Sequence, residues 1–351
     1  MMKRSLLVLV AVALIGRAGP AAPATCPFNI PIVTLPPQQV AGFNWGNVIR
    51  PLGDACITKI EVDPTNDSAW YAAGPNGVYM TKNAGTTWSK PVSGNAVALL
   101  VAAGQPNLVY AGVGTRLYQS KDSGQNWSII HVFAKPVYSI LVAGSTLYVG
   151  LAWNNHVDPS GVFVSALGGS PMVFHAFGAG HTGLIVWTLS RDPLSGMVYA
   201  GTEIFDHPQP YHPPFFRSAN NGLSWTNVGA SLPWHVVDSS VRPTDGHLYA
   251  LTEGKGVYGS ANQGNNWQAP VSPAGLGDAL KMDSNTPTRL YAGRQKVGAL
   301  TGGIFRSGDA GLHFSPIGLD GVTVADIAVN GNVTRIYAAA YGSGIYTAII
   351  P

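Results

Sequence analysis

The octapeptide Ser120-Lys121-Asp122-Ser123-Gly124-Gln125-Asn126-Trp127 is the clearest copy of a motif that recurs along this chain. Its form is Ser/Thr-x-Asp-x-Gly-x-x-Trp. The Asp position can hydrogen-bond the backbone of a tight turn, glycine permits a positive φ, and tryptophan supplies a large apolar packing surface. The motif therefore predicts a structural turn that fastens two strands, so we do not expect Asp122 to be catalytic.

Further copies of the motif recur with asparagine or aspartate at the acidic position, and one decayed copy keeps the glycine but has Leu167 at the acidic position. They are Thr81–Trp88 with Asn83, Ser218–Trp225 with Asn220, Ser260–Trp267 with Asn262, Ser307–Phe314 with Asp309, and the decayed Ser165–Met172 with Gly169. The last motif position is filled by Trp88, Trp127, Trp225 and Trp267 in four copies. Repetition at intervals of about 40 to 50 residues indicates a repeat protein.

Three short apolar runs precede each motif. The middle run reads Leu108–Gly112 before the second copy and returns as Leu248-Tyr249-Ala250; the third run returns as Gly77-Val78-Tyr79 and Gly256-Val257-Tyr258. Together with the segment after the tryptophan, they make four antiparallel strands per repeat, which is the blade of a propeller. The sequence predicts an all-β, seven-bladed β-propeller of four-stranded antiparallel blades, with blades 1–7 from residue 56 to 351.

The seventh repeat, from Val322 to Ile350, ends before its fourth strand. The missing part is present near the N-terminus, where Gly42-Phe43-Asn44-Trp45 matches the Gly-x-x-Trp ending of the motif. We expect residues 25–55 to form an arm whose strand completes the last blade, because such closure removes an exposed sheet edge.

The first residues are typical of an export signal. Lys3 and Arg4 precede the apolar run Leu6–Ile15, and Ala22-Pro23-Ala24 matches a cleavage site. The prediction is a signal peptide over 1–24 and a single secreted or periplasmic domain over 25–351, with an uncleaved anchor as the alternative. No later segment is long and apolar enough to suggest a membrane span.

The chain has two cysteines, Cys26 and Cys56. An even number in an exported protein favours a disulfide, which would pin the N-terminal arm. Lipidation of Cys26 is the alternative, although Pro23-Ala24-Thr25 is a poor lipobox and Cys56 would then remain a free thiol.

Charged residues make up 11% of the chain and the net charge is +3. The basic residues are dispersed and form no stripe, so nucleic acid is not expected as a partner. We expect a monomer without a cofactor that binds a carbohydrate or an extracytoplasmic protein.

Loops between the second and third strands of a blade, and the connections between blades, share one face of a propeller, here called the loop face. Three of these loops are long: Leu151–Ser160, Glu203–Pro214 and Arg294–Gly302. Long loops held by a rigid scaffold often carry function. The candidate ligand-binding residues on this face are Trp153, His156, His181, Tyr211, His212, Trp234, His235 and Arg294.

Acidic residues on the loop face are the candidates for catalysis: Asp158, Glu203, Asp206 and Glu253. Glycoside hydrolysis requires two carboxylates at a defined separation, and spacing along the chain pairs none of them. Asp206, His207 and His212 form a weak candidate metal site, because their spacing matches no established ligand motif.

The motif and its strand pattern resemble the Asp-box, or bacterial neuraminidase repeat, propellers over nearly all of the expected mature chain. Proteins with these repeats include sialidases, xyloglucan-cleaving glycosidases, sortilin-type receptors and photosystem II assembly factors. No Arg-Ile-Pro sequence of the sialidase type is present. The prediction is a binding or scaffold module that uses the loops of blades 3, 4 and 6; the alternatives are a glycoside hydrolase of the Asp-box type and an assembly factor for a membrane complex.

Overall fold

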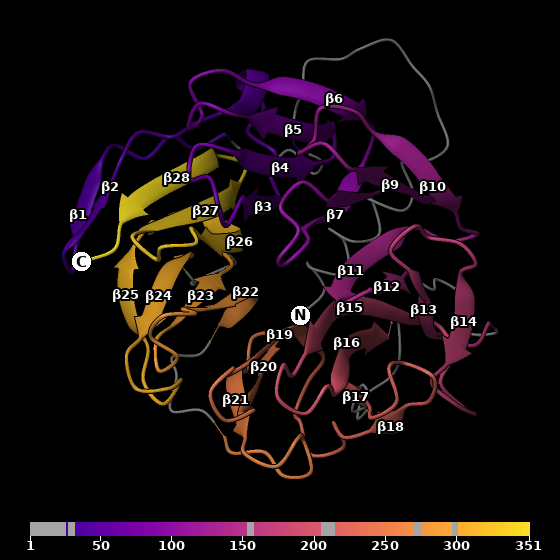
Figure 1. Ribbon diagram of the computed structural model, residues 1–351. Coiled ribbons are helices and arrows are strands. Elements are labelled where there is room, and N and C mark those ends of the chain that lie inside the picture. The colour runs from indigo at the N-terminus through magenta and orange to yellow at the C-terminus, as the bar shows by residue number, and fades with distance from the viewer. Residues whose placement is uncertain (1–25, 27–31, 153–157, 205–214, 270–274, 297–300) are drawn as a thin grey trace.

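The computed structural model describes residues 26, 32–152, 158–204, 215–269, 275–296 and 301–351. Within these residues, seven antiparallel sheets form a ring around a central axis (Figure 1). The predicted seven-bladed β-propeller is confirmed. None of the helices in the described ranges has the length and apolar character needed to cross a membrane.

Each blade begins with the strand nearest the axis and proceeds outward in chain order. Blade 1 comprises β3 (Lys59–Val62), β4 (Trp70–Gly74), β5 (Gly77–Thr81) and β6 (Ser89–Ser93). Blade 2 comprises β7 (Ala96–Val101), β8 (Val109–Val113), β9 (Arg116–Ser120) and β10 (Ser128–Val132). Blade 3 comprises β11 (Val137–Ala143), β12 (Thr146–Leu151), β13 (Gly161–Ala166) and β14 (Val173–Ala176). Blade 4 comprises β15 (Leu184–Arg191), β16 (Val198–Ile204), β17 (Phe215–Ser218) and β18 (Thr226–Asn227).

The remaining blades follow the same order. Blade 5 comprises β19 (Val236–Val241), β20 (Leu248–Thr252) and β21 (Gly256–Ser260). In its fourth position, a single antiparallel bridge joins Gly259 to Gln268. Blade 6 comprises β22 (Leu276–Met282), β23 (Leu290–Arg294), β24 (Gly303–Ser307) and β25 (Ser315–Gly318). Blade 7 comprises β26 (Thr323–Val329), β27 (Arg335–Tyr341) and β28 (Gly344–Ile349), followed outward by β2 (Phe43–Trp45) and β1 (Gln38–Val40).

The N-terminal arm closes the ring as predicted. Asn44 and Trp45 of β2 pair with Ile349 and Ala348 of β28, and Figure 1 shows β1 and β2 beside the C-terminal end of the chain. The sequence did not indicate β1, which adds a fifth strand outside β2. Trp45 is 2% exposed, and its indole Nε1 donates to the Ile317 carbonyl of blade 6 at 2.6 Å. The closing strand therefore joins two blades as well as the two ends of the chain.

The repeated motif forms the turn expected of it. In the second copy, the Ser120 hydroxyl donates to Asp122 at 2.8 Å and accepts from the Gly124 amide at 2.9 Å. The Asp122 carboxylate accepts from the Asn126 amide at 2.9 Å, and these hydrogen bonds lower the pKa of Asp122 to about 2. The carboxylate is thus occupied by the turn, which supports a structural role.

The motif glycine also fastens adjacent blades. Gly124 of blade 2 has a φ of +79°, and a Cβ there would lie 2.6 Å from the ring of Tyr71 in β4 of blade 1. Gly222 meets Tyr148 in the same way, at 2.9 Å. The turn of one blade therefore packs against the second-strand tyrosine of the preceding blade, which explains why both residues recur in the repeats.

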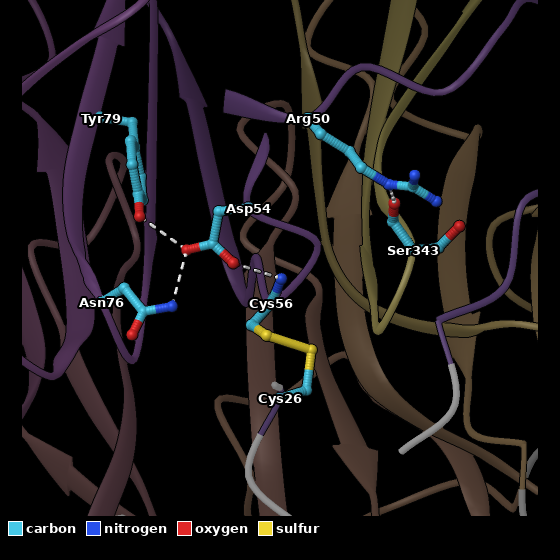
Figure 2. The surroundings of a disulfide bond; sticks show 7 residues. All are labelled: Cys26, Arg50, Asp54, Cys56, Asn76, Tyr79 and Ser343. Atoms are coloured by element: carbon cyan, nitrogen blue, oxygen red, sulfur yellow. Dashed lines mark hydrogen bonds between the residues drawn. A yellow bond between two sulfur atoms is a disulfide. The ribbon is translucent and has the colours of Figure 1, made fainter. Parts of the chain in front are cut away.

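A disulfide between Cys26 and Cys56 holds the arm, as Figure 2 shows. The buried Asp54 carboxylate next to it accepts hydrogen bonds from the Cys56 amide at 2.8 Å and the Tyr79 hydroxyl at 2.6 Å. Asn76 donates a third bond at 3.1 Å. Asp54 therefore attaches the disulfide segment to β5 and to the β4–β5 loop of blade 1, at the seam where the chain closes.

Candidate functional site

Three titratable side chains from blades 4 and 5 meet on the loop face. Glu203 lies near the end of β16, His235 directly precedes β19, and Glu253 directly follows β20. The His235 Nε2 atom is 3.2 Å from Glu253 Oε2 and 3.6 Å from Glu203 Oε1. Facing ligand atoms of all three lie within 4.8 Å of one another. We call these three residues the Glu-His-Glu cluster.

The cluster is largely enclosed by protein. Glu203 is 5% exposed and His235 is 9% exposed, whereas Glu253 is half-buried. The Glu253 amide donates to the His235 carbonyl at 3.1 Å, which ties the two segments of blade 5 together. The Trp234 ring packs against the His235 imidazole with centroids 4.7 Å apart. The three side chains are therefore held in place by strand ends and backbone contacts.

Two β-bulges bring aromatic side chains to the cluster. The register of the first strand shifts between Val186 and Thr188 in blade 4 and between Val137 and Ser139 in blade 3, so Trp187 and Tyr138 are the extra residues. A bulge re-aims the side chain of its extra residue. The Trp187 indole donates to Glu203 Oε2 at 2.5 Å, and the Tyr138 ring meets that indole edge-on at 5.3 Å.

Tyr138 is a neutral group at this site. Burial raises the pKa of its hydroxyl well above the usual range, and the nearby Glu203 carboxylate raises the pKa further. The hydroxyl therefore remains protonated at physiological pH and contributes a polar O–H, not a charge.

Of the candidates from the sequence, the structure brings together Glu203, His235 and Glu253. Asp158 forms an ion pair with Lys135 at 3.8 Å. His181 lies edge-on to Phe216 with centroids 4.9 Å apart, and burial lowers the pKa of its imidazole.

Arg294 belongs to blade 6. Its guanidinium donates to the Gly302 carbonyl and the Thr301 hydroxyl and lies 4.4 Å from the centre of the Phe305 ring. Burial lowers the pKa of this guanidinium. These contacts hold the side chain against its own blade, where it stabilises the connection between β23 and β24.

Six candidates lie outside the described residues, and the metal site predicted at residues 206–212 falls among them. They are Trp153, His156, Asp206, His207, Tyr211 and His212.

Trp187 and Tyr138 were not among the candidates from the sequence. The one available signal was the identity of the residue at the bulge position in the first strand of each blade. The bulge residues of five blades are Val97, Tyr138, Trp187, Val237 and Ala325. Among these five residues of the described chain, the large aromatic ones belong to the adjacent blades 3 and 4, but recognising the position requires knowledge of the bulges.

Charged side chains also line the central channel, which forms a cavity of about 290 Å³ bordered by Tyr138 and Trp187. Two of its carboxylates bind backbone amides of the following blade: Asp238 accepts from Leu280 at 2.8 Å, and Asp326 accepts from Ile60 at 2.9 Å. These acids therefore link the inner strands of adjacent blades. A second cavity, of about 380 Å³, lies where the first two strands of several blades connect, away from the cluster.

Because Glu61 lines this channel, we expect the stability of the protein to depend on pH. Burial raises the pKa of its carboxyl from about 4.5, the value in the unfolded chain, to about 7 in the folded protein. The nearby Lys281 opposes part of this rise. The folded state thus binds more protons between these values, and stability falls as the pH rises through this window. In Glu61→Gln this loss is absent, so the variant should gain about 1–3 kcal/mol relative to the wild type between pH 4 and pH 8.

Urea unfolding at several pH values measures this difference. Asp320→Asn, which removes an exposed carboxylate from the loop between β25 and β26, is the control and should follow the wild-type profile. Parallel pH profiles for the wild type and Glu61→Gln would contradict the assignment.

No family model matches the sequence, and a search of curated proteins finds no match. Solved structures do resemble the chain. A structure of YCF48 bound to D1 peptide has a TM-score of 0.62 at 16% identity, and the match covers 92% of this chain and 99% of that chain. An ancestral GH74 enzyme has a TM-score of 0.66 at 17% identity, over 88% of this chain and 45% of that chain.

The extracellular domain of a hybrid two-component system from B. thetaiotaomicron has a TM-score of 0.62 at 12% identity, over 88% of this chain and 40% of that chain. The chain thus spans less than half the length of the GH74 chain and of the extracellular-domain chain that it matches. At these identities the likeness shows the propeller fold alone, because one fold carries many unrelated functions.

Proposed function

We propose that this chain is an extracytoplasmic recognition module that binds a carbohydrate at the Glu-His-Glu cluster on the loop face. The observation that carries the proposal is the meeting of Glu203 and Glu253 with Trp187 and Trp234 at the junction of blades 4 and 5. Carboxylates accept hydrogen bonds from sugar hydroxyls, and half-exposed indole rings can stack on the apolar faces of sugar rings.

The electrostatics of the cluster favour a hydroxyl-rich ligand over an anionic one. The cluster holds two carboxylates and one imidazole, so its own charge is negative whether the imidazole is neutral or protonated. An anionic ligand would be repelled by the carboxylates. Neutral or basic sugars avoid that repulsion and supply the donors that the carboxylates accept.

The extracytoplasmic location is supported by the disulfide. Structural disulfides persist in oxidising compartments and are rare in the cytosol. Cys26 and Cys56 are both buried against blade 7 and the arm, so the bond is part of the packed structure. Export through the signal sequence of residues 1–24 belongs to the same proposal.

A glycan and polysaccharide array with the purified protein tests the proposal. Glu253→Gln keeps the shape of the side chain and removes its charge, so we expect at least a 10-fold loss of affinity for the bound glycan, about 1.4 kcal/mol or more. Trp187→Phe, which removes the indole N–H that orients Glu203, should weaken binding to a similar degree.

Asp320→Asn is the matched control, because it removes a carboxylate from the same face at the junction of blades 6 and 7, and it should bind as the wild type does. Equal binding by Glu253→Gln and the wild type would exclude the cluster. A protein that binds no glycan would direct the search to a protein partner.

A glycoside hydrolase is the second candidate, on one specific observation. Facing oxygens of Glu203 and Glu253 lie within 4.8 Å of each other, and retaining glycosidases hold their two carboxyl groups about 5–5.5 Å apart. Turnover of a glycan that binds, with retention of configuration and a rate reduced at least 10³-fold in both Glu203→Gln and Glu253→Gln, would establish it. Binding without turnover would exclude the hydrolase and support the recognition module.

A further inference from the structure

The geometry points to a divalent metal site, best suited to Zn²⁺, formed by Glu203, His235 and Glu253. The inference does not depend on carbohydrate binding, because it concerns the ion alone. It places the metal between blades 4 and 5 and uses none of Asp206, His207 and His212, the ligands that the sequence suggested.

The distances within the cluster are the first support. A tetrahedral zinc ion lies 2.0–2.1 Å from an imidazole nitrogen and about 2.0–2.2 Å from a carboxylate oxygen, so two such ligands are separated by about 3.4 Å. The separations from His235 Nε2 are 3.2 Å to Glu253 and 3.6 Å to Glu203. Charge-assisted hydrogen bonds between nitrogen and carboxylate oxygen are shorter, about 2.7–2.9 Å. The cluster therefore has the ligand spacing of a small coordination polyhedron.

The burial of His235 is the second, independent support. The residue is 9% exposed, so its imidazole lies within the protein. The Nε2 atom of this buried ring faces both carboxylates. A buried imidazole whose Nε2 faces two carboxylates is positioned as a ligand.

The charge of the cluster is the third support. The carboxylates of Glu203 and Glu253 carry like charges at close range, and a divalent cation between them would offset their mutual repulsion. With a neutral imidazole, the three ligands themselves carry a charge of −2, which matches the charge of one divalent ion. One nitrogen and two oxygen ligands suit Zn²⁺ among the borderline ions, whereas Ca²⁺ and Mg²⁺ prefer oxygen ligands alone.

The surroundings orient the ligands as metal sites require. The Trp187 indole donates to the outer oxygen of Glu203, Oε2, while Oε1 faces His235. Hydrogen bonds of this kind to ligating carboxylates support metal affinity. With three protein ligands, the fourth position of a tetrahedral ion is open to water or to a ligand oxygen.

Zinc content and affinity test the inference on the full chain, purified without a histidine tag and stripped with a chelator. After incubation with Zn²⁺ and desalting, mass spectrometry should find about one zinc per chain in the wild type. Calorimetric titration should show affinity reduced at least 100-fold in His235→Gln and Glu253→Gln. Bound Co²⁺ should give the strong visible absorption of tetrahedral coordination.

Trp187→Phe separates positioning from general damage to the fold. It should retain one zinc per chain but bind it about 10-fold more weakly, because the indole acts through Glu203. Asp320→Asn should match the wild type, and thermal unfolding without metal verifies that each variant folds. Equal zinc binding by the wild type, His235→Gln and Glu253→Gln, or none in the folded wild type, would overturn the inference. Glycan binding that persists in the stripped protein would leave the proposed function intact.

Discussion

Replacing Trp45 with alanine is expected to lower the free energy of unfolding by about 3–5 kcal/mol, the range for removing a large buried aromatic side chain. Trp45 is 2% exposed and packs beside Phe43 in the core of blades 6 and 7. Its indole also bonds the Ile317 carbonyl. The substitution therefore removes packing, a buried hydrogen bond and the anchor of the closing strand together.

Denaturant unfolding measures this effect, and Trp88→Ala is the matched control. Trp88 occupies the same motif position in blade 1 but is half-buried, so its loss should cost about half as much. Similar costs for the two substitutions would indicate that β2 contributes no more than an ordinary motif strand and would contradict its role in closing the ring.

Removing the disulfide by replacing Cys26 and Cys56 together with serine is expected to cost about 3–4 kcal/mol. The bond closes a segment with a sequence separation of 30 residues, and opening that segment increases the conformational entropy of the unfolded chain. The Asp54 contacts to Tyr79 and Asn76 remain in the variant, so the folded propeller should persist with a lower melting temperature.

Reduction of the wild type should reproduce the stability of the double variant, because both lack the same bond. Thiol titration in denaturant distinguishes the disulfide from lipidation: no thiol should react before reduction and two should react afterwards. One reactive thiol before reduction, or an unchanged stability in the double variant, would contradict the structure of the seam.

Most of the fold could be predicted from the repeated motif, because each copy encodes a local turn whose chemistry depends on a few neighbouring residues. The pairing of β2 with β28 followed from one fragment, Gly42-Phe43-Asn44-Trp45. The fifth strand β1 did not, because its residues Gln38–Val40 carry no motif and pair only with β2. The pattern also did not predict that a single bridge takes the place of a fourth strand in blade 5.

The sequence predicted which face of the propeller carries the candidate site, but it did not predict which side chains meet there. Glu203, His235 and Glu253 were each recognised on loops of the same face, yet their meeting depends on where three strands of two blades end. Trp187 reaches Glu203 through a β-bulge, and a shift of register leaves no mark in residue type. Sequence therefore located the surface, and three-dimensional structure was required to assemble the site.

Hydrogen–deuterium exchange with and without a glycan that binds on the array tests whether the ligand binds at the Glu-His-Glu cluster, because it locates the bound ligand without a mutation. We expect slower exchange in the segments that carry the cluster, residues 184–188, 199–203 and 234–254, and unchanged exchange at the motif turn of residues 120–127 on the opposite face. Protection at the motif turns, with none around the Glu-His-Glu cluster, would contradict it.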